Sequence, residues 1–168
     1  MAAGVTCAAL AWVTLVVTAP VALSRGRLPA VTLAVYQAGA LVCHQRPERS
    51  FHLAGVQLPV CARCFGLYLS GAVGLTLASR RRHALPTRAA RTLLALAALP
   101  IATTVALEWL GMIETSNLQR MLTGLPLGFA AGVVILRSLS GPPQDVSKDA
   151  KWMRYDRRSD GHQDHDRR

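Results

Sequence analysis

The stretch VTCAALAWVTLVVTAPVAL, residues 5–23, contains no charged residue and is long enough to cross a bilayer as an α-helix. Four further apolar windows follow it, at residues 28–42, 60–78, 92–110 and 121–136. The second window is short, about 15 residues, and is also compatible with a half-spanning segment. We therefore predict an all-α fold, an integral membrane helical bundle of five transmembrane helices, with four as the alternative.

Acidic residues are rare in this part of the chain. Up to Leu136 they are only Glu48, Glu108 and Glu114, whereas a soluble fold of this length needs far more charged surface. The 168 residues are enough for one compact unit. We expect residues 1–137 to form the transmembrane domain. Residues 138–168, which are rich in Pro, Asp, Lys and Arg, are expected to form a charged, disordered cytoplasmic tail.

The formal net charge of +10 does not indicate nucleic-acid binding. The arginines cluster between the apolar windows and in the tail, as the positive-inside rule distributes them, and do not line one helix face. The loop Ser79–Arg91 carries five arginines and is expected to be cytoplasmic. With five spans, the turn at residues 24–27 and the tail lie on the same, cytoplasmic side of the membrane as this loop. This predicts a multi-pass protein of the plasma membrane, with its N-terminus outside and its C-terminus in the cytoplasm.

Small residues recur at a spacing of four in two of the windows. Such rows let helix backbones approach closely in lipid, and we expect them to pack helices together within the bundle. They are Gly66, Ser70 and Gly74 in the third window, and Gly124 and Gly128 in the fifth.

Three of the four cysteines lie within residues 43–64. Cys61 and Cys64 are three apart at the start of the third window, so they lie on one face of the first helical turn. A short loop places the end of the second window on the same side of the membrane. A Cys3His set suits tetrahedral zinc, although adjacent residues chelate one ion with difficulty. The candidate metal ligands are Cys43, His44, Cys61 and Cys64.

Thiol redox chemistry is the alternative for these cysteines. A C-x-x-C pair at a helix N-terminus has its thiolate favoured by the helix dipole and by the neighbouring Arg63. Disulfides also persist outside the cytoplasm, so a membrane thiol-disulfide oxidoreductase is a second candidate. In a third interpretation the cysteines are a structural staple in a non-enzymatic partner or transport subunit. Cys7 lies apart, in the first window, and is expected to act as a small apolar residue.

Polar residues gather on the same expected side of the membrane. Ionisable groups at membrane depth are costly and are therefore functional candidates, which makes Glu108 a candidate catalytic acid or base. An ion pair with an arginine is the alternative. The arginines on this side run against the positive-inside rule, so we expect something to offset their charge. Guanidinium groups bind phosphate and carboxylate. The predicted anion- or lipid-binding residues are Arg46, Arg49, Arg63, Ser116, Asn117 and Arg120.

Three segments carry a recognisable pattern: residues 43–51 read CHQRPERSF, residues 59–68 read PVCARCFGLY, and residues 116–124 read SNLQRMLTG. Together they resemble a family of small bacterial and archaeal membrane proteins of unknown function, with the signature CHQxPxRSF, CxRCxGxY and SNxxRxxTGxxxG. The resemblance covers residues 43–128 and implies a shared site without naming a reaction.

The leading functional hypothesis is a metal-binding membrane protein with zinc as its cofactor. The lipid bilayer and an anionic or lipid-derived ligand are its expected partners. A zinc ion with an open coordination position lowers the pKa of bound water and makes hydrolysis or group transfer possible. The sequence does not decide whether the protein is an enzyme.

Overall fold

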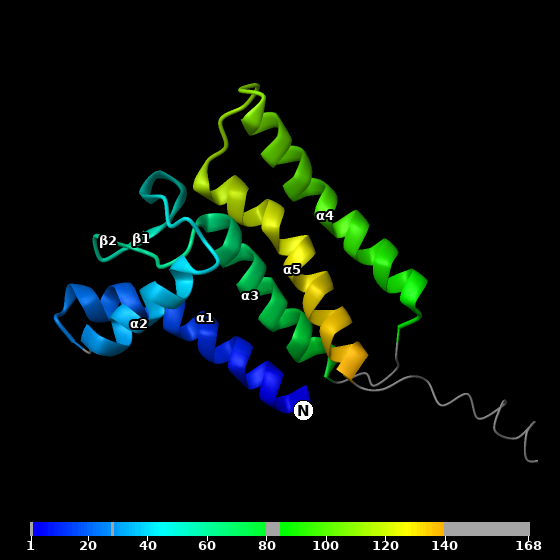
Figure 1. The fold of residues 1–168 in the computed structure, drawn as a ribbon, viewed down its shortest axis with the longest axis horizontal. Coiled ribbons are helices and arrows are strands. Elements are labelled where there is room, and N and C mark those ends of the chain that lie inside the picture. Colours follow the sequence, from blue (N-terminus) through cyan, green and yellow to red (C-terminus); the bar gives the residue numbers. More distant parts are fainter. Residues whose placement is uncertain (1, 28, 80–84, 140–168) are drawn as a thin grey trace, which may run out of the picture.

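The computed structural model describes residues 2–27, 29–79 and 85–139, in which the chain forms five α-helices (Figure 1). Each apolar window of the sequence corresponds to one helix, so the predicted all-α membrane bundle is confirmed. The predicted tail lies almost wholly outside the described residues. The helices are α1 (Ala2–Ser24), α2 (Pro29–Ala40), α3 (Ala62–Ala78), α4 (Thr87–Trp109) and α5 (Asn117–Leu139).

Helix length separates three helices that can span a membrane from two shorter ones. Helices α1, α4 and α5 have 23 residues each and are apolar enough to cross a membrane. Helix α3 has 17 residues, a rise of about 26 Å, and α2 has 12, a rise of about 18 Å. The hydrocarbon core of a bilayer is about 30 Å thick. Helix α2 is therefore too short to cross it, as in the half-spanning interpretation of this window.

Helices α3 and α5 pack along each other through their small residues. A methyl group added at Gly124 would lie 2.8 Å from the carbonyl oxygen of Arg63, closer than any real side chain permits. Groups added at Gly66 and Gly74 would collide with the backbone of α5, at Met121 and Phe129. The expectation that the small residues pack helices within the bundle is confirmed.

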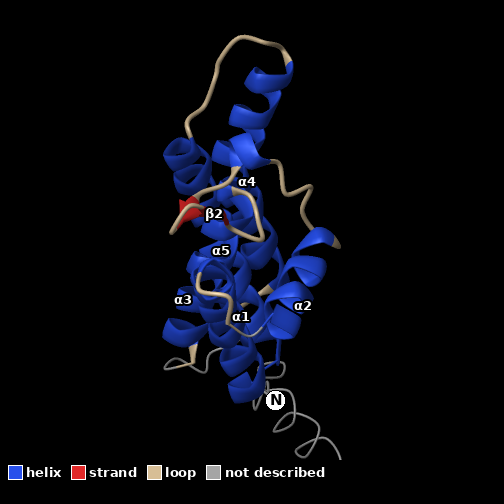
Figure 2. Cartoon of the chain, turned by 90° about the vertical axis from the view of Figure 1, so that its left-hand side faces the viewer, coloured by secondary structure: helices blue, strands red, loops and turns tan. Residues whose placement is uncertain are grey.

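The connection between α2 and α3 forms a cap at one end of the bundle (Figures 1 and 2). It contains a 3-10 turn at Pro47–Arg49 and a short antiparallel hairpin of β1 (His52–Leu53) and β2 (Val56–Gln57). The Gln45 side chain donates to the carbonyl oxygens of Tyr36 and Pro59, each at 2.7 Å, and Gln57 donates to the Gln45 carbonyl at 2.6 Å. These bonds fix the cap against the end of α2.

The direction of α1 corrects the topology expected from the sequence. Ala2 packs against the cluster of Leu75, Ala78 and Leu136, so α1 begins where α3 and α5 end. Further along, Val16 packs in the cluster that holds Cys43. The N-terminal end of α1 is therefore opposite the cysteines, and the turn at residues 24–27 is on the cysteine side. When α2 is counted as a full span, the N-terminus is expected on the cysteine side and the turn at residues 24–27 on the opposite side. The structure reverses both of these expectations, and the helix directions agree with the four-span alternative.

Candidate metal centre

Three cysteines from two segments of the chain meet at the cap. Cys61 immediately precedes α3 in extended conformation, with φ −70° and ψ 163°, and Cys64 lies in the first turn of the helix. Cys43 comes from the loop after α2, and its sulfur accepts a hydrogen bond from the Cys61 N–H at 3.1 Å. The three Sγ atoms all lie within 4.8 Å of one another. The structure thus brings together the three cysteines that the sequence grouped.

The Cys61 thiol is surrounded by hydrogen-bond donors. The pairing of the two thiols raises the pKa of Cys64 and lowers that of Cys61, whose sulfur accepts from the Cys64 side chain, the backbone N–H groups of Cys64 and Arg63, and the Cys43 side chain. For Cys61, burial acts in the opposite direction and is outweighed. Donors directed at a sulfur favour its thiolate form, and the thiolate is the form that acts as metal ligand or nucleophile.

His44, the fourth candidate ligand of the sequence, does not lie within the cluster of three sulfur atoms. Cys43 is 8% exposed, whereas His44 is exposed on the surface of the cap. The residues at this point are not helical, so neighbouring side chains in the loop are directed differently. His44 instead lines the pocket that adjoins the cluster.

A pocket of about 430 Å³ opens beside the cysteine cluster. All three cysteines line it, and four of the six residues predicted to bind an anion are present. Among the described residues that form its wall, none is acidic. The lining residues are Val42, Cys43, His44, Gln45, Arg46, Arg49, Cys61, Arg63, Cys64, Trp109 and Arg120.

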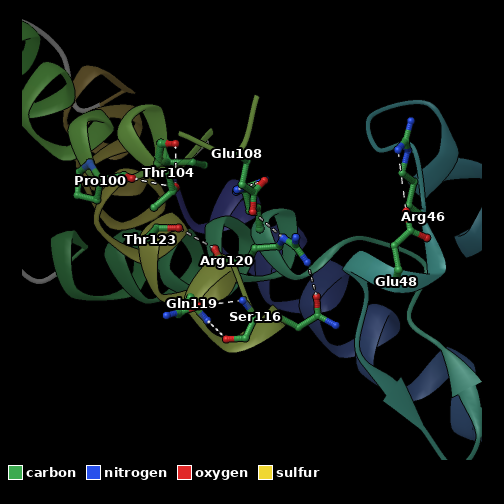
Figure 3. Close-up of polar contacts among 12 residues, drawn as sticks. Arg46, Glu48, Pro100, Thr104, Glu108, Ser116, Gln119, Arg120 and Thr123 are labelled. Atoms are coloured by element: carbon green, nitrogen blue, oxygen red, sulfur yellow. Dashed lines mark hydrogen bonds and ion pairs between the residues drawn. The ribbon is translucent and has the colours of Figure 1, made fainter. Parts of the chain in front are cut away.

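Glu108, near the end of α4, forms ion pairs with two arginines of the pocket, Arg63 and Arg120. Figure 3 shows it beside Arg120. Its Oε2 is 2.8 Å from Arg63 Nη2, and its Oε1 accepts a hydrogen bond of 3.2 Å from Arg120 Nε. The side chains of Glu108, Arg63 and Arg120 are 8%, 13% and 12% exposed. Since both carboxylate oxygens are engaged, the geometry favours the ion-pair interpretation of Glu108 over a free acid or base.

The remaining two residues of the predicted anion set support the fold. Asn117 accepts a hydrogen bond from Arg120 Nη1 at 3.2 Å and donates to the carbonyl of Ser50 at 3.1 Å, which connects α5 to the cap. The Ser116 hydroxyl accepts a hydrogen bond from the N–H of Gln119, whose side chain accepts from the Ser116 N–H. This reciprocal pair caps the start of α5. Neither residue lines the pocket.

Sequence reasoning missed two further features of the site. Val42 and Trp109 form apolar parts of the pocket wall. Gln45, which lines the pocket and clamps the cap, has a positive φ of 48°. A left-handed glutamine is uncommon, and no sequence pattern except its place within the CHQ motif pointed to it.

Comparison with known proteins places these residues in a family. Residues 43–134 match the family model described as Predicted membrane protein (DUF2085). The chain belongs to this family. The DUF2085 match begins at Cys43 and ends within α5, so it contains every residue of the pocket except Val42. The family resemblance of the sequence is confirmed.

Two archaeal proteins are similar in sequence to this DUF2085 protein. An uncharacterized protein of Methanocaldococcus jannaschii is 32% identical over 110 residues, which are 63% of this chain and 69% of the relative. An uncharacterized protein of Methanothermobacter thermautotrophicus is 36% identical over 93 residues, 55% of this chain and 83% of the relative. No solved structure matches the chain significantly.

Proposed function

We propose that this membrane protein binds one divalent transition-metal ion through Cys43, Cys61 and Cys64, and that the ion is zinc. The observation that carries the proposal is the mutual approach of three Sγ atoms within 4.8 Å. A single disulfide uses two cysteines and has no need of the third, whereas a metal ion requires several ligands around one point. Thiolates are soft ligands, and zinc accepts sulfur ligands in tetrahedral geometry.

The surrounding charges fit such a site. A divalent ion with three thiolates carries one net negative charge, which needs a positive neighbour when it is withdrawn from water. Arg63 and Arg120 supply it, because Glu108 offsets only one of the two. Three protein ligands also leave a fourth coordination position, as catalytic zinc sites do. The pocket lies beside the cluster and gives a small molecule access to it.

Replacing His44 with alanine tests the ligand set. We expect the His44→Ala protein to keep the metal content of the wild type, because the imidazole lies outside the three-sulfur cluster. The measurement is elemental mass spectrometry of the purified protein, with Cys43→Ser as the matched variant at the adjacent position. Loss of metal from both variants would indicate that His44 is also a ligand. Full metal content in both variants would contradict the proposed metal site.

A membrane thiol-disulfide oxidoreductase is the second candidate, favoured by the donors directed at the Cys61 sulfur. In that function the thiolate attacks a disulfide of a partner, and Cys61 and Cys64 become a disulfide while the partner is reduced to two thiols. It predicts a redox-sensitive pair and no bound metal. A purely structural staple predicts a loss of stability on cysteine replacement, with neither metal nor redox cycling.

We infer that the cysteine end of the bundle is extracytoplasmic, in the plasma membrane. The opposite end carries Arg88, Arg91 and Arg137 at helix ends, next to the most basic loop and tail of the sequence. The positive-inside rule assigns such an end to the cytoplasm. A membrane-impermeant thiol reagent should therefore label Cys61 or Cys64 in intact cells after mild reduction and metal chelation. Labelling that requires lysis would reverse this orientation.

A further inference from the structure

The pocket beside the cysteine cluster carries more positive charge than its surroundings neutralise. Four guanidinium groups line it. Two carboxylates offset them in part: Glu108 between Arg63 and Arg120, and Glu48 at 4.0 Å from Arg46. The Arg63 Nε is buried and has no hydrogen-bond partner among the residues that the structure describes. Buried donors of this kind are costly unless something accepts from them.

The same pocket has an apolar wall that is open to its surroundings. Val42 and Trp109 line it and are 62% and 84% exposed. Each has an exposed apolar neighbour in the chain, Leu41 and Leu110. Trp109 ends the membrane-spanning helix α4, and a tryptophan there lies at the level of the lipid head groups. The pocket therefore combines cationic side chains with an apolar opening at the depth of the membrane interface.

We propose that this pocket binds a phosphate group, and that the phosphate belongs to an amphiphile of the bilayer. Guanidinium groups bind phosphate oxygens bidentately, and Arg46 and Arg49, which line the pocket outside the buried ion pairs of Glu108, are available for this. The exposed Val42 and Trp109 would contact the acyl chain. A volume of about 430 Å³ is enough for a head group with its first carbon atoms. The inference concerns the proposed metal site's own pocket but does not require the metal.

Binding of three probes to the full chain in a neutral detergent tests this inference. The probes are inorganic phosphate, a short-chain phosphatidate, and a phosphatidylcholine with the same chains. Arg46 and Arg49 lie outside the buried ion-pair network, so a double Arg46→Gln, Arg49→Gln variant should fold. We expect it to bind phosphatidate at least about tenfold more weakly, because it loses charge-assisted hydrogen bonds. The matched control is Arg88→Gln, Arg91→Gln, at the other end of α4, which should bind like the wild type.

The affinities of the three probes, and the effect of the pocket variant on them, decide between the possible ligands. Tighter binding of phosphatidate than of both other probes, weakened in the pocket variant alone, supports a phosphate-bearing lipid as ligand. Equal binding of inorganic phosphate, weakened in the same variant, supports the phosphate site with a soluble source. Phosphatidate and phosphatidylcholine that bind equally, both weakened in the pocket variant, support the phosphate of either lipid as the ligand, because phosphatidylcholine also carries a phosphate group. Phosphatidate binding that is absent, or unchanged in the pocket variant, overturns the inference. Metal content of the same samples separates this result from the metal proposal, because a metal-loaded protein without phosphate binding would refute only the phosphate site.

Discussion

Replacing Cys61 with serine is expected to remove nearly all bound metal from the protein. Cys61 is one of the three sulfur ligands in the proposed site. Structural zinc sites bind with about 10–16 kcal/mol shared among four ligands, so one lost thiolate costs roughly 3 kcal/mol, or more than about a hundredfold in affinity. Elemental mass spectrometry of the purified variant should show only traces of metal.

Cys7 provides the matched control for this experiment. It is an exposed cysteine of α1, outside the three-sulfur cluster, so Cys7→Ser should bind metal like the wild type. A Cys61→Ser protein that is folded and still fully loaded would contradict the proposal. Cys64→Ser provides an independent second variant if Cys61→Ser does not fold, since it removes another ligand from the same cluster.

Replacing Glu108 with glutamine is expected to lower the free energy of unfolding by about 3–5 kcal/mol, the usual cost of removing one partner from a buried ion pair. The change leaves Arg63 and Arg120 buried side by side, with only a neutral amide between them. Their mutual repulsion and unmet hydrogen bonds act directly on the contact between α3, α4 and α5. Thermal or denaturant unfolding of the protein in detergent measures the effect.

Glu48 is the matched control for Glu108. Its carboxylate is exposed and lies 4.0 Å from an equally exposed Arg46. Water and salt screen such pairs, so Glu48→Gln should change the free energy of unfolding by less than about 1 kcal/mol. If Glu108→Gln were as stable as Glu48→Gln, the buried ion-pair network would not hold these helices together, and Glu108 would again be a candidate acid or base.

The helices themselves were largely predictable, because a membrane helix is recorded directly in the apolar composition of its sequence. The boundaries differ where polar residues belong to a helix. Helix α4 begins at Thr87, five residues before its apolar window, because Arg88 and Arg91 are exposed helical residues. Helix α5 begins at Asn117 because Ser116 and Gln119 cap it, and hydropathy does not detect a cap.

The end of α2 was not predictable from composition, and the topology depended on it. Leu41 and Val42 are apolar and extend the window, yet the helix stops at Ala40. Its end is fixed by tertiary contacts. Gln45 bonds back to the carbonyl of Tyr36, and an added methyl at Gly39 would collide with the backbone at Pro59. These contacts shorten α2 and place the N-terminal end of α1 opposite the cysteines.

The convergence of the cysteines was predictable from the C-x-x-C spacing and the short connection, but the choice between Cys43 and His44 was not. That choice depends on the path of a non-helical loop, in which one side chain is buried and the next is exposed. Likewise, several arginines were possible ion-pair partners of Glu108 from the sequence. The packing of α3 against α5 determines that these partners are Arg63 and Arg120.

The most direct test of a three-cysteine metal site is the metal content of the wild-type protein, measured by elemental mass spectrometry after purification in detergent, together with a count of alkylatable thiols before and after chelation. We predict about one zinc per chain, with three thiols that become reactive only when the metal is removed. A protein without metal, in which Cys61 and Cys64 form a disulfide, would contradict the proposal and support thiol exchange instead.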